Sequence, residues 1–455
     1  MSEPHHRDSL VTAYHDLLGE GDPLAEWEQL QEGMAAHHLY FGSRPVCSVL
    51  RPFLLPTQEY ARVRRAAFHF FGALTTLYHW LMADDGMRHQ VGLRAVEEAA
   101  LHVEPGYDSP DGIGRLDGFF TTDGGIQFVE YNADSPGGLL YGHELATLFE
   151  QLPTLRRFAA DHPLRLAKVA GTVLDTLLEH YRRWGGSEAT PRIAIVDWEG
   201  QSTANEFLLC QEHFGRAGIP TVITHPGALT IRGNELWDDV SGQAVQIVYK
   251  RVLVGELLNT VGLENPLTDA MRQGAACVVN SYRAQLLFQK SLFALLSEYR
   301  RSDHFTPAQQ RAIRDHLPWS RLLREGRTHF HGEEIDLLPW ALDAQEHLVL
   351  KPNSEYGGKG IVLGWEVSPG EWHAALQAAL DSGEAHIVQE RIFVRTEPFP
   401  LVRDGTLRLE ERFADIDPYI FAPHRVEGAG VRLGSSGLLN VTAGGGSAVP
   451  LAVVG

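Results

Sequence analysis

Hydrophobic residues in the first hundred positions recur at intervals of three and four. The pattern is clearest over residues 58–82 (QEYARVRRAAFHFFGALTTLYHWLM) and continues over residues 92–103. This spacing matches the 3.6-residue period of an α-helix with one buried face. Residues 1–107 are therefore expected to form a helical N-terminal region.

The pattern changes to alternation between residues 114 and 132. Two alternating runs, GRLDGFFTT and IQFVEYN, flank an Asp-Gly-Gly turn. Period two is typical of strands, and Asp-Gly-Gly between two such runs predicts a hairpin. Helical spacing returns from about residue 141 and ends at RRWGGSEATP, where the glycines and the proline predict a domain boundary. The second predicted domain covers residues 108–185.

From residue 192 onward, short apolar runs alternate with helical segments. RIAIVDW, IPTVITH and QAVQIVYKRV are predicted strands, and a helix over residues 204–218 separates the first two. Strand, helix and strand at this spacing predict a parallel α/β unit. This third predicted domain covers residues 186–285.

The last predicted domain covers residues 286–455. A strand, a glycine loop and a second strand are predicted over residues 347–364, followed by a helix and by a strand that ends near residue 392. The chain closes with two apolar runs around a glycine cluster, within residues 437–454.

Composition narrows the class of protein. The 455 residues are 44% hydrophobic and 21% charged, as in a globular chain long enough for two or three packed domains. The net charge of −19 argues against a general nucleic-acid binder, although a local basic groove could hold nucleotide phosphates. Three widely spaced cysteines, Cys47, Cys210 and Cys277, indicate a reducing cytoplasm. The polar first residues lack a signal core, and no run reaches the roughly 18 apolar residues of a membrane span. Neither nucleic acid nor membrane is an expected partner.

LKPNSEYGGKGI is the first candidate for chemistry. Lys351 ends an apolar strand, and Gly357, Gly358 and Gly360 follow in a loop. Glycines let backbone N–H groups turn toward a phosphate, and a lysine adds a positive charge. The segment is not a Walker A loop, because its spacing differs from that motif. A plain hairpin with solvated lysines is the alternative.

Two further segments place polar residues at the ends of apolar elements. FQKSLFALL puts Lys290 at the head of an apolar stretch within a helix predicted over residues 283–299, and HIVQERI ends a strand with Gln389 and Glu390. Taken alone, Lys290 is an ordinary lysine whose stem lies along an apolar surface. The second segment alone is an ordinary strand that leaves its sheet.

The hairpin carries the candidate metal site. Glu130 and Asn132 share a face of its second strand, and strand pairing brings Asp117 of the first strand close to Glu130. Two carboxylates and an amide oxygen are hard ligands that Mg²⁺ takes together with substrate phosphates. Arg115 lies two residues before Asp117, on the same face, where it could meet a transferring phosphoryl group. A hydrated hairpin tip without metal is the alternative.

Two weaker patterns carry no assignment. GAGVRLGSSG, residues 428–437, has the wrong spacing for a dinucleotide fingerprint, and no βαβ unit follows it. His329 and His331 could suggest a metal, but a chain with 22 histidines contains such pairs by chance. The segment that holds them is expected to be a solvated loop.

Together these motifs resemble the glutathionylspermidine synthetase family. GRLDGFF and QFVEYNADSPGG resemble its metal-binding segment, in which Arg-x-Asp on one strand is followed by Glu-x-Asn-Ala-Asp on the next. FQKSLFALL resembles its lysine-bearing helix, VLKPNSEYGGKGI its strand and nucleotide-covering loop, and IVQERI the hinge strand beside the adenine. The resemblance covers residues 113–142 and 280–395.

The resemblance implies an α/β fold of circularly permuted ATP-grasp type, with a pre-ATP-grasp parallel α/β domain and a helical N-terminal region. In this family the metal-binding strands come early in the chain and the nucleotide-gripping lobe late. Eukaryotic-type glutathione synthetase shares the permutation in looser form. The implied activity is an ATP-dependent carboxylate–amine ligase. ATP phosphorylates a carboxylate, an amine attacks the acyl phosphate, and an amide forms with release of ADP and phosphate.

The resemblance also implies cofactors, substrates and a role for each matched residue. ATP and Mg²⁺ are the implied cofactors, and the substrates are a small carboxylate and an amine such as an amino acid, a peptide or a polyamine; a homodimer is left open. The implied roles are Mg²⁺ binding by Asp117, Glu130 and Asn132, catalysis by Arg115 with Asp134 and Ser135 on the acceptor side, and nucleotide binding by Lys290, Lys351, Glu355, Gly357, Gly358, Lys359, Gly360, Gln389 and Glu390.

Alternatives to this assignment stay open. A kinase that stops at a phosphorylated carboxylate, or a non-catalytic ATP-grasp scaffold, would use the same fold. A conventional, unpermuted arrangement would draw metal ligands from Glu411 and Asn440, which lack the tight Glu-x-Asn pairing. Gly358 and Lys359 stand where the family has an Arg-Glu pair, and residues 135–137 where it commonly has Thr-Pro-Thr. The resemblance therefore indicates the type of reaction more firmly than it indicates the substrate.

Overall fold

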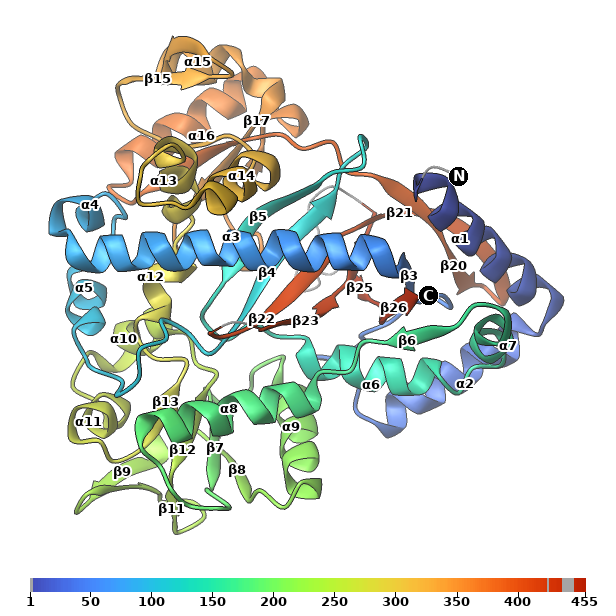
Figure 1. The fold of residues 1–455 in the computed structure, drawn as a ribbon, viewed down its shortest axis with the longest axis horizontal. Helices are drawn as coiled ribbons and strands as arrows, with labels where there is room; N and C mark the ends of the chain where they lie inside the picture. The colour runs from blue at the N-terminus through green and yellow to red at the C-terminus, as the bar shows by residue number, and fades with distance from the viewer. Residues whose placement is uncertain (1–2, 424, 436–445) are drawn as a thin grey trace.

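The computed structural model describes residues 3–423, 425–435 and 446–455 and combines helices with several sheets, as the sequence predicts (Figure 1). A hairpin sheet occupies the centre, a parallel sheet with its helices lies below it, and a smaller antiparallel lobe lies above it in that view. The predicted helical N-terminal region contains α1 (Glu3–Glu20), α2 (Pro23–Ala36), α3 (Thr57–Ala83), α4 (Asp85–His89), α5 (Ala95–Leu101) and the short strands β1 (Tyr40–Phe41), β2 (Arg44–Pro45) and β3 (Phe53–Pro56).

The central sheet is antiparallel, with strand order β23-β22-β4-β5. The predicted hairpin is confirmed as β4 (Ile113–Phe120) and β5 (Ile126–Asn132). Two strands from late in the chain, β22 (Asp417–Phe421) and β23 (Arg425–Gly430), extend the sheet beside β4. The hairpin therefore has a C-terminal neighbour on the same sheet, which its local pattern does not reveal.

The long helix α3 covers one face of the central sheet. Its apolar residues at three- and four-residue spacing are buried, as the sequence predicts. Phe70 packs on Phe128 of β5 and Phe71 on Tyr131, with ring centroids 5.3 and 5.7 Å apart. Such aromatic pairs contribute about 0.5–1.5 kcal/mol each beyond the area that they bury, so the helix is a firm backing for the strands that carry the candidate site.

The end of the chain also joins strands from its beginning. β26 (Leu451–Val454) pairs in parallel with β3 and antiparallel with β6 (Leu164–Leu166). The first of the two predicted C-terminal apolar runs lies outside the described residues, as does Asn440. A further antiparallel sheet contains β20 (Thr396–Arg403), β21 (Thr406–Ala414), β24 (Arg432–Gly434) and β25 (Ser447–Ala448).

The predicted parallel unit is confirmed. Strands run in the order β13-β12-β7-β8, and every pairing is parallel. The strand expected over residues 243–252 divides at Gln246, because its half-exposed first part pairs in a separate antiparallel sheet. Apart from β6, the helices and strands between residues 139 and 279, which include the parallel unit, are α6 (Leu139–Phe149), α7 (Pro153–Asp161), α8 (Ala170–Trp184), β7 (Ile193–Val196), α9 (Ala204–Arg216), β8 (Thr221–Thr224), η1 (Pro226–Ala228), β9 (Leu229–Arg232), β10 (Glu235–Asp238), β11 (Gln243–Val245), β12 (Ile247–Lys250), α10 (Val254–Val261), α11 (Pro266–Gln273) and β13 (Cys277–Val279).

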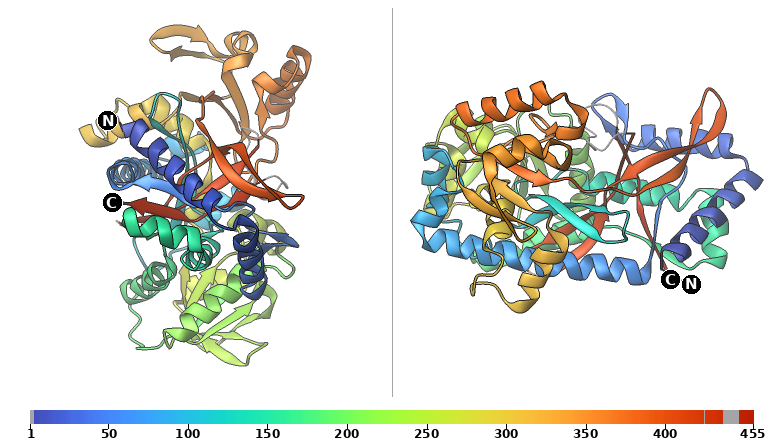
Figure 2. Two further views of the ribbon diagram at one scale, coloured as in Figure 1. Left: turned by 90° about the vertical axis from the view of Figure 1, so that its right-hand side faces the viewer. Right: turned by 90° about the horizontal axis from the view of Figure 1, so that it is seen from above.

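The upper lobe contains the predicted strand, glycine loop and strand. β17 (Leu348–Pro352) and β18 (Val362–Leu363) join β19 (His386–Glu390) and β14 (Ser320–Leu322) in one antiparallel sheet. Figure 2 shows this lobe projecting from the body of the molecule. Its other elements are α14 (Pro307–His316), β15 (Arg327–Phe330), β16 (Glu333–Asp336), α15 (Leu337–Asp343), η2 (Gln345–His347), η3 (Gly364–Glu366) and α16 (Pro369–Asp381).

Two local predictions are wrong. The helix expected over residues 283–299 breaks into α12 (Ala284–Phe288) and α13 (Ser291–Tyr299), because the backbone and side chain of Asn353 accept hydrogen bonds from the amides of Lys290 and Ser291 at 3.1 and 2.8 Å. The expected loop around His329 is the hairpin of β15 and β16, with His331 in its turn.

Within the described part of the chain, no helix has the length and apolar character needed to span a bilayer.

Candidate functional site

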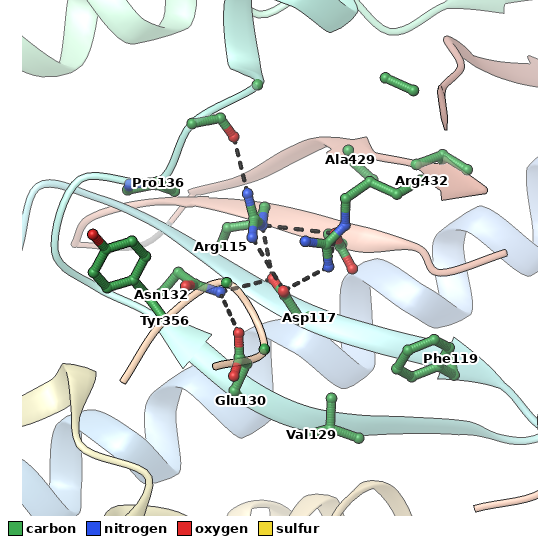
Figure 3. Close-up of a pocket in the computed structure, with 18 of the residues that line it drawn as sticks. Arg115, Asp117, Phe119, Val129, Glu130, Asn132, Pro136, Tyr356, Ala429 and Arg432 are labelled. Carbon is green, nitrogen blue, oxygen red and sulfur yellow. Dashed lines mark hydrogen bonds and ion pairs between the residues drawn. The ribbon is translucent and has the colours of Figure 1, made fainter. Parts of the chain in front are cut away.

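A cavity of about 830 Å³ lies where the central sheet, the parallel unit and the upper lobe meet. The predicted residues Arg115, Asp117, Glu130 and Asn132 line it from the hairpin, and Lys351 lines it from the lobe. A concave space of this size with convergent polar groups is typical of a small-molecule site. Figure 3 shows the hairpin side of the cavity.

Asp117 is the centre of the hairpin group. Strand register places Asp117 opposite Glu130 and Arg115 opposite Asn132, so the predicted proximity is confirmed. Arg115 Nε and Nη2 donate to the two oxygens of Asp117 at 2.7 and 3.1 Å. Asn132 Nδ2 donates to Asp117 Oδ1 at 2.9 Å, and Arg432 Nη2 donates to Oδ2 at 2.6 Å (Figure 3).

These four donors fill the acceptor positions of the Asp117 carboxylate, which has about four lone-pair sites. Burial raises the pKa of Asp117, but the two guanidinium groups of Arg115 and Arg432 outweigh it and hold the pKa below its ordinary value. The carboxylate is therefore charged at neutral pH. Direct metal binding by Asp117 would require one of these donors to turn away.

Sequence reasoning missed three residues of this group. Arg432 lies in GAGVRLGSSG, a segment that carried no assignment, and its guanidinium also pairs with Asp415 and Asp417 at 2.6 and 3.0 Å. Asp415 and Asp417 alternate just before and at the start of a buried strand, as Glu130 and Asn132 alternate at the end of theirs. That repeated spacing was the signal that could have found the two aspartates.

Asp117, Asp415 and Asp417 give this group three carboxyl groups, whereas Arg115 and Arg432 give it two guanidinium groups. Burial raises the pKa of Asp417, and Arg432 and Arg115 offset only part of that effect. Arg432 Nη2 lies 3.0 Å from Asp417 Oδ2 as an ion pair, but no donor among the described residues meets this oxygen with hydrogen-bond geometry. Asp417 is thus the member of the group best placed to hold a proton.

Glu130 and Asn132 retain free acceptor capacity. Asn132 Nδ2 donates to Glu130 Oε1 at 3.3 Å, and Lys290 Nζ lies 3.4 Å from Glu130 Oε2. Both side chains line the cavity, and the donor set is a carboxylate with an amide oxygen. This chemistry fits Mg²⁺, which takes one or two protein carboxylates and completes its shell with water and phosphate.

Lys351 is buried on the other side of the cavity. Its Nζ donates to Gln389 Oε1 at 2.7 Å and to the carbonyl of Val129 at 3.4 Å. Burial is the main cause that lowers the pKa of Lys351 to about 8; Glu130 opposes this effect, and Lys290 contributes to it. The lysine therefore carries an incompletely neutralised charge beside open space.

The glycine loop bridges the lobe to the parallel unit. Lys290 Nζ donates to the carbonyl of Glu355 at 2.6 Å, and Tyr356 Oη donates to Glu256 Oε1 of α10 at 2.7 Å. Gly357 and Gly358 have positive φ angles of 65° and 75° and line the cavity. Lys359, the next residue in the loop, forms an ion pair with Glu355. Neither Lys359 nor Gly360 lines the cavity.

Gln389 and Glu390 lie on the cavity wall, but their side chains are engaged within the lobe. Gln389 Nε2 donates to Ser320 Oγ at 3.0 Å, while Glu390 Oε1 lies 2.8 Å from His331 Nε2. An adenine base in this part of the cavity would contact the backbone of β19 rather than the side chains of Gln389 and Glu390. The roles predicted for the two residues stay predictions.

Asp134 and Ser135 line the cavity but connect the hairpin to the parallel unit. Asp134 is buried in an ion pair with Lys250 and accepts a hydrogen bond from the Val254 amide at 2.6 Å. Ser135 Oγ donates to the carbonyl of Lys250 at 2.6 Å. The acceptor-side role predicted for these residues stays a prediction, since both side chains already have partners.

The turn after Asp134 is also held in place. Glu206 of α9 accepts hydrogen bonds from the amides of Gly138 and Leu140 at 2.9 and 3.0 Å. Arg115 Nη1 donates to the carbonyl of Gly137 at 2.9 Å, and Arg251 Nη1 to that of Pro136 at 2.8 Å. This end of the cavity is thus a fixed backbone surface.

Comparisons with known proteins point to ligases by name. No protein-family model matches the chain. A protein of Frankia alni named "Putative glutamate–cysteine ligase 2-3" is 26% identical over 464 residues, which cover 95% of this chain and 50% of that protein. "Putative glutamate–cysteine ligase 2-2" of Frankia casuarinae is 25% identical over 384 residues, covering 81% of this chain and 40% of that protein. The chain spans half or less of the length of these curated relatives.

A solved structure is similar across almost the whole chain. A glutathione synthetase-like effector of Globodera pallida, in its apo form, superimposes with a TM-score of 0.59 at 14% identity. The match covers 95% of this chain and 94% of the effector. The chain therefore shares a mixed α/β fold with this effector.

Proposed function

We propose that this protein is an ATP-dependent carboxylate–amine ligase with a circularly permuted ATP-grasp fold, related to the glutathionylspermidine synthetase group. One observation carries the proposal: Glu130, Asn132, Lys351 and two arginines converge on one cavity. Phosphoryl transfer depends on positioning and charge neutralisation more than on covalent help from the protein. The relatives' names and the glutathione synthetase-like fold agree with an amide-forming ligase.

Glu130 and Asn132 would hold Mg²⁺, and Asp117 would join them if a guanidinium turns toward substrate. When bound, ATP would supply the phosphoryl group, and Mg²⁺ would neutralise charge on its oxygens. Lys351 and Lys290 would meet nucleotide phosphates from the lobe side. The loop from Ser354 to Gly360 would cover the nucleotide and exclude water, which protects an acyl phosphate from hydrolysis.

Arg432 is the better placed of the two arginines for contact with the transferring group. Its side chain is 21% exposed, against 12% for Arg115, and it lines the cavity. Arg115 is anchored through all three guanidinium nitrogens to Asp117 and Gly137. We therefore assign Arg115 mainly to positioning Asp117 and the turn, and Arg432 to stabilising charge on the phosphoryl oxygens.

ADP release that depends on both a carboxylate and an amine is the expected result for a ligase. The purified protein is incubated with ATP and Mg²⁺ while amino acids, short peptides and polyamines are supplied singly and in pairs. A carboxylate alone should give slow release, and the correct amine should accelerate it at least about tenfold while an amide appears by mass spectrometry.

The same assay separates the alternatives. A kinase would release ADP at full rate without amine, and added hydroxylamine would trap its acyl phosphate as a hydroxamate. A non-catalytic scaffold would bind ATP in calorimetry but release no ADP with any pair. Either result would overturn the ligase assignment.

Replacing Lys351 with methionine should weaken ATP binding at least about tenfold, equivalent to about 1.4 kcal/mol. Methionine fills a similar volume in the buried site without the charge, so the loss reports on phosphate attraction. Isothermal calorimetry with ATP and Mg²⁺ measures the affinity. Lys168→Met, at an exposed lysine outside the cavity lining, serves as the matched control, and equal affinities of the two variants would contradict the role of Lys351.

ATP affinity should also fall as pH rises through 8. The free protein loses the Lys351 proton near pH 8, because burial lowers that pKa. Bound phosphate favours the charged form, so the complex keeps the proton to higher pH and binding requires proton uptake. Calorimetry from pH 7 to 9 should show a rising Kd for the parent protein and a flatter profile for Lys351→Met.

A further inference from the structure

Three histidines surround the buried carboxylate of Glu144 where α2, α6 and α9 meet. His213 Nε2 of α9 lies 2.5 Å from Glu144 Oε1, and His37 Nδ1, at the end of α2, lies 3.5 Å from Oε2. His143, next to Glu144 on α6, packs its ring 4.6 Å from that of His213. His143 also lines the large cavity, so the cluster borders the proposed reaction site without belonging to its phosphate side.

We propose that His143, Glu144 and His213 form a binding site for a divalent transition-metal ion such as Zn²⁺. One ligand atom from each of the three residues lies within 4.8 Å of the other two. Imidazole nitrogens with a carboxylate oxygen are the mixed set that Zn²⁺ takes, whereas Mg²⁺ prefers oxygen ligands. Ligands of a tetrahedral Zn²⁺ site lie roughly 3.4 Å apart, so the three side chains must rearrange to complete the site.

The cluster offers the donor types that a transition metal takes. Glu144 supplies a carboxylate oxygen, and His143 and His213 supply imidazole nitrogens. One carboxylate among three imidazoles also has more nitrogen neighbours than an ordinary ion pair requires.

One hydrogen bond restricts how His143 takes part. Its Nδ1 accepts from the backbone amide of Ala170 at 3.1 Å, so the proton of the neutral ring lies on Nε2. The ring must turn about its Cβ–Cγ bond and give up that hydrogen bond before it offers a lone pair to a metal. Glu144 and His213 therefore supply most of the affinity, and His37, whose side chain is 40% exposed, can swing in as a fourth ligand.

A metal here would fix the end of the cavity opposite the phosphate side. Glu206 already ties α9 to the first residues of α6 through the amides of Gly138 and Leu140. The contact of His213 with Glu144 is a second tie between the same two helices, further along α6, and a bound metal would replace it with two coordination bonds. The consequence is a stiffer glycine turn where the acceptor substrate would lie.

Zinc titration of the full-length protein tests the site without any nucleotide. Apo protein, stripped with chelator, should bind one equivalent of Zn²⁺ with micromolar or tighter affinity, measured by competition with a chromophoric chelator. Glu144→Gln and His213→Ala should each weaken binding at least about 100-fold, and His143→Ala at least about tenfold. His102→Ala, an exposed histidine at the end of α5, is the matched control and should bind as the parent does.

Repeating the titration in a Glu130→Ala, Asn132→Ala background removes the proposed Mg²⁺ seat as a competing site. His143→Ala leaves the Glu144–His213 pair intact, so it decides the matter if the other variants lose their fold by circular dichroism. Cobalt substitution gives a second readout, since bound Co²⁺ with nitrogen ligands absorbs visible light. Equal zinc affinity of parent and His143→Ala, or no zinc binding by the parent, would overturn the proposal.

Discussion

Replacing Glu130 and Asn132 together with alanine is expected to abolish Mg²⁺-dependent ATP turnover. The double change removes the two hairpin side chains that retain acceptor capacity toward the cavity, while the Arg115–Asp117 pair stays. Without them the ion has no protein seat against the phosphates. We expect kcat to fall at least about 1,000-fold, equivalent to about 4 kcal/mol in the barrier.

The fold should survive this change. Glu130 and Asn132 are only half-buried, and the backbone pairing of β4 with β5 does not depend on their side chains. A matched variant with Asp123→Ala and Gln127→Ala alters two polar positions of the same hairpin, away from the cavity. That control should keep its turnover and its melting temperature. If the Glu130, Asn132 variant turned over ATP at the parent rate with Mg²⁺, the hairpin could not be the metal site.

The polar residues Arg115, Asp117, Glu130 and Asn132 of the hairpin were predictable from the sequence, because short segments of the chain contain the patterns that place them. Alternation set the faces of both strands, Asp-Gly-Gly set the turn, and together they placed Asp117 opposite Glu130. The strand and loop around Lys351 were predictable for the same reason, since an apolar run and a glycine-rich segment are visible in a short window.

The missed parts depend on contacts between distant segments. Arg432 begins β24, in a separate sheet, and reaches Asp117 from 315 positions away; no local pattern reports such a contact. The break before α13 likewise comes from Asn353, 62 positions later, which takes the amide of Ser291. Helical spacing alone predicted an unbroken helix there, because tertiary contacts override propensity.

The roles of Asp134 and Ser135 show the opposite limit. Both residues line the cavity, but a sequence does not show which partner a side chain has already taken. Lys250 is the partner of both residues: its ammonium group pairs with Asp134, and its backbone carbonyl accepts a hydrogen bond from Ser135. A polar residue at a cavity wall can thus connect two parts of the fold as readily as it can bind a substrate.

Replacing Arg432 with lysine is expected to lower kcat at least about 100-fold, equivalent to about 2.7 kcal/mol, with a smaller change in the KM for ATP. The guanidinium of Arg432 donates to Asp415 through Nε at 2.7 Å and to Asp117 through Nη2 at 2.6 Å. Lysine keeps the charge but cannot hold two carboxylates and a phosphoryl oxygen in one planar fork.

Lysine rather than alanine is the informative change at this position. Alanine would leave Asp117, Asp415 and Asp417 buried around one remaining guanidinium, at a cost of about 3–5 kcal/mol in folding stability. Arg432→Lys limits that loss, and its melting temperature separates misfolding from a catalytic defect. Arg408→Lys, an exposed arginine on β21, is the matched control and should leave kcat unchanged. A variant with lower melting temperature but parental kcat would show that Arg432 only balances the charge of its aspartates. A fall in kcat with intact folding would place its guanidinium at the transferring phosphoryl group.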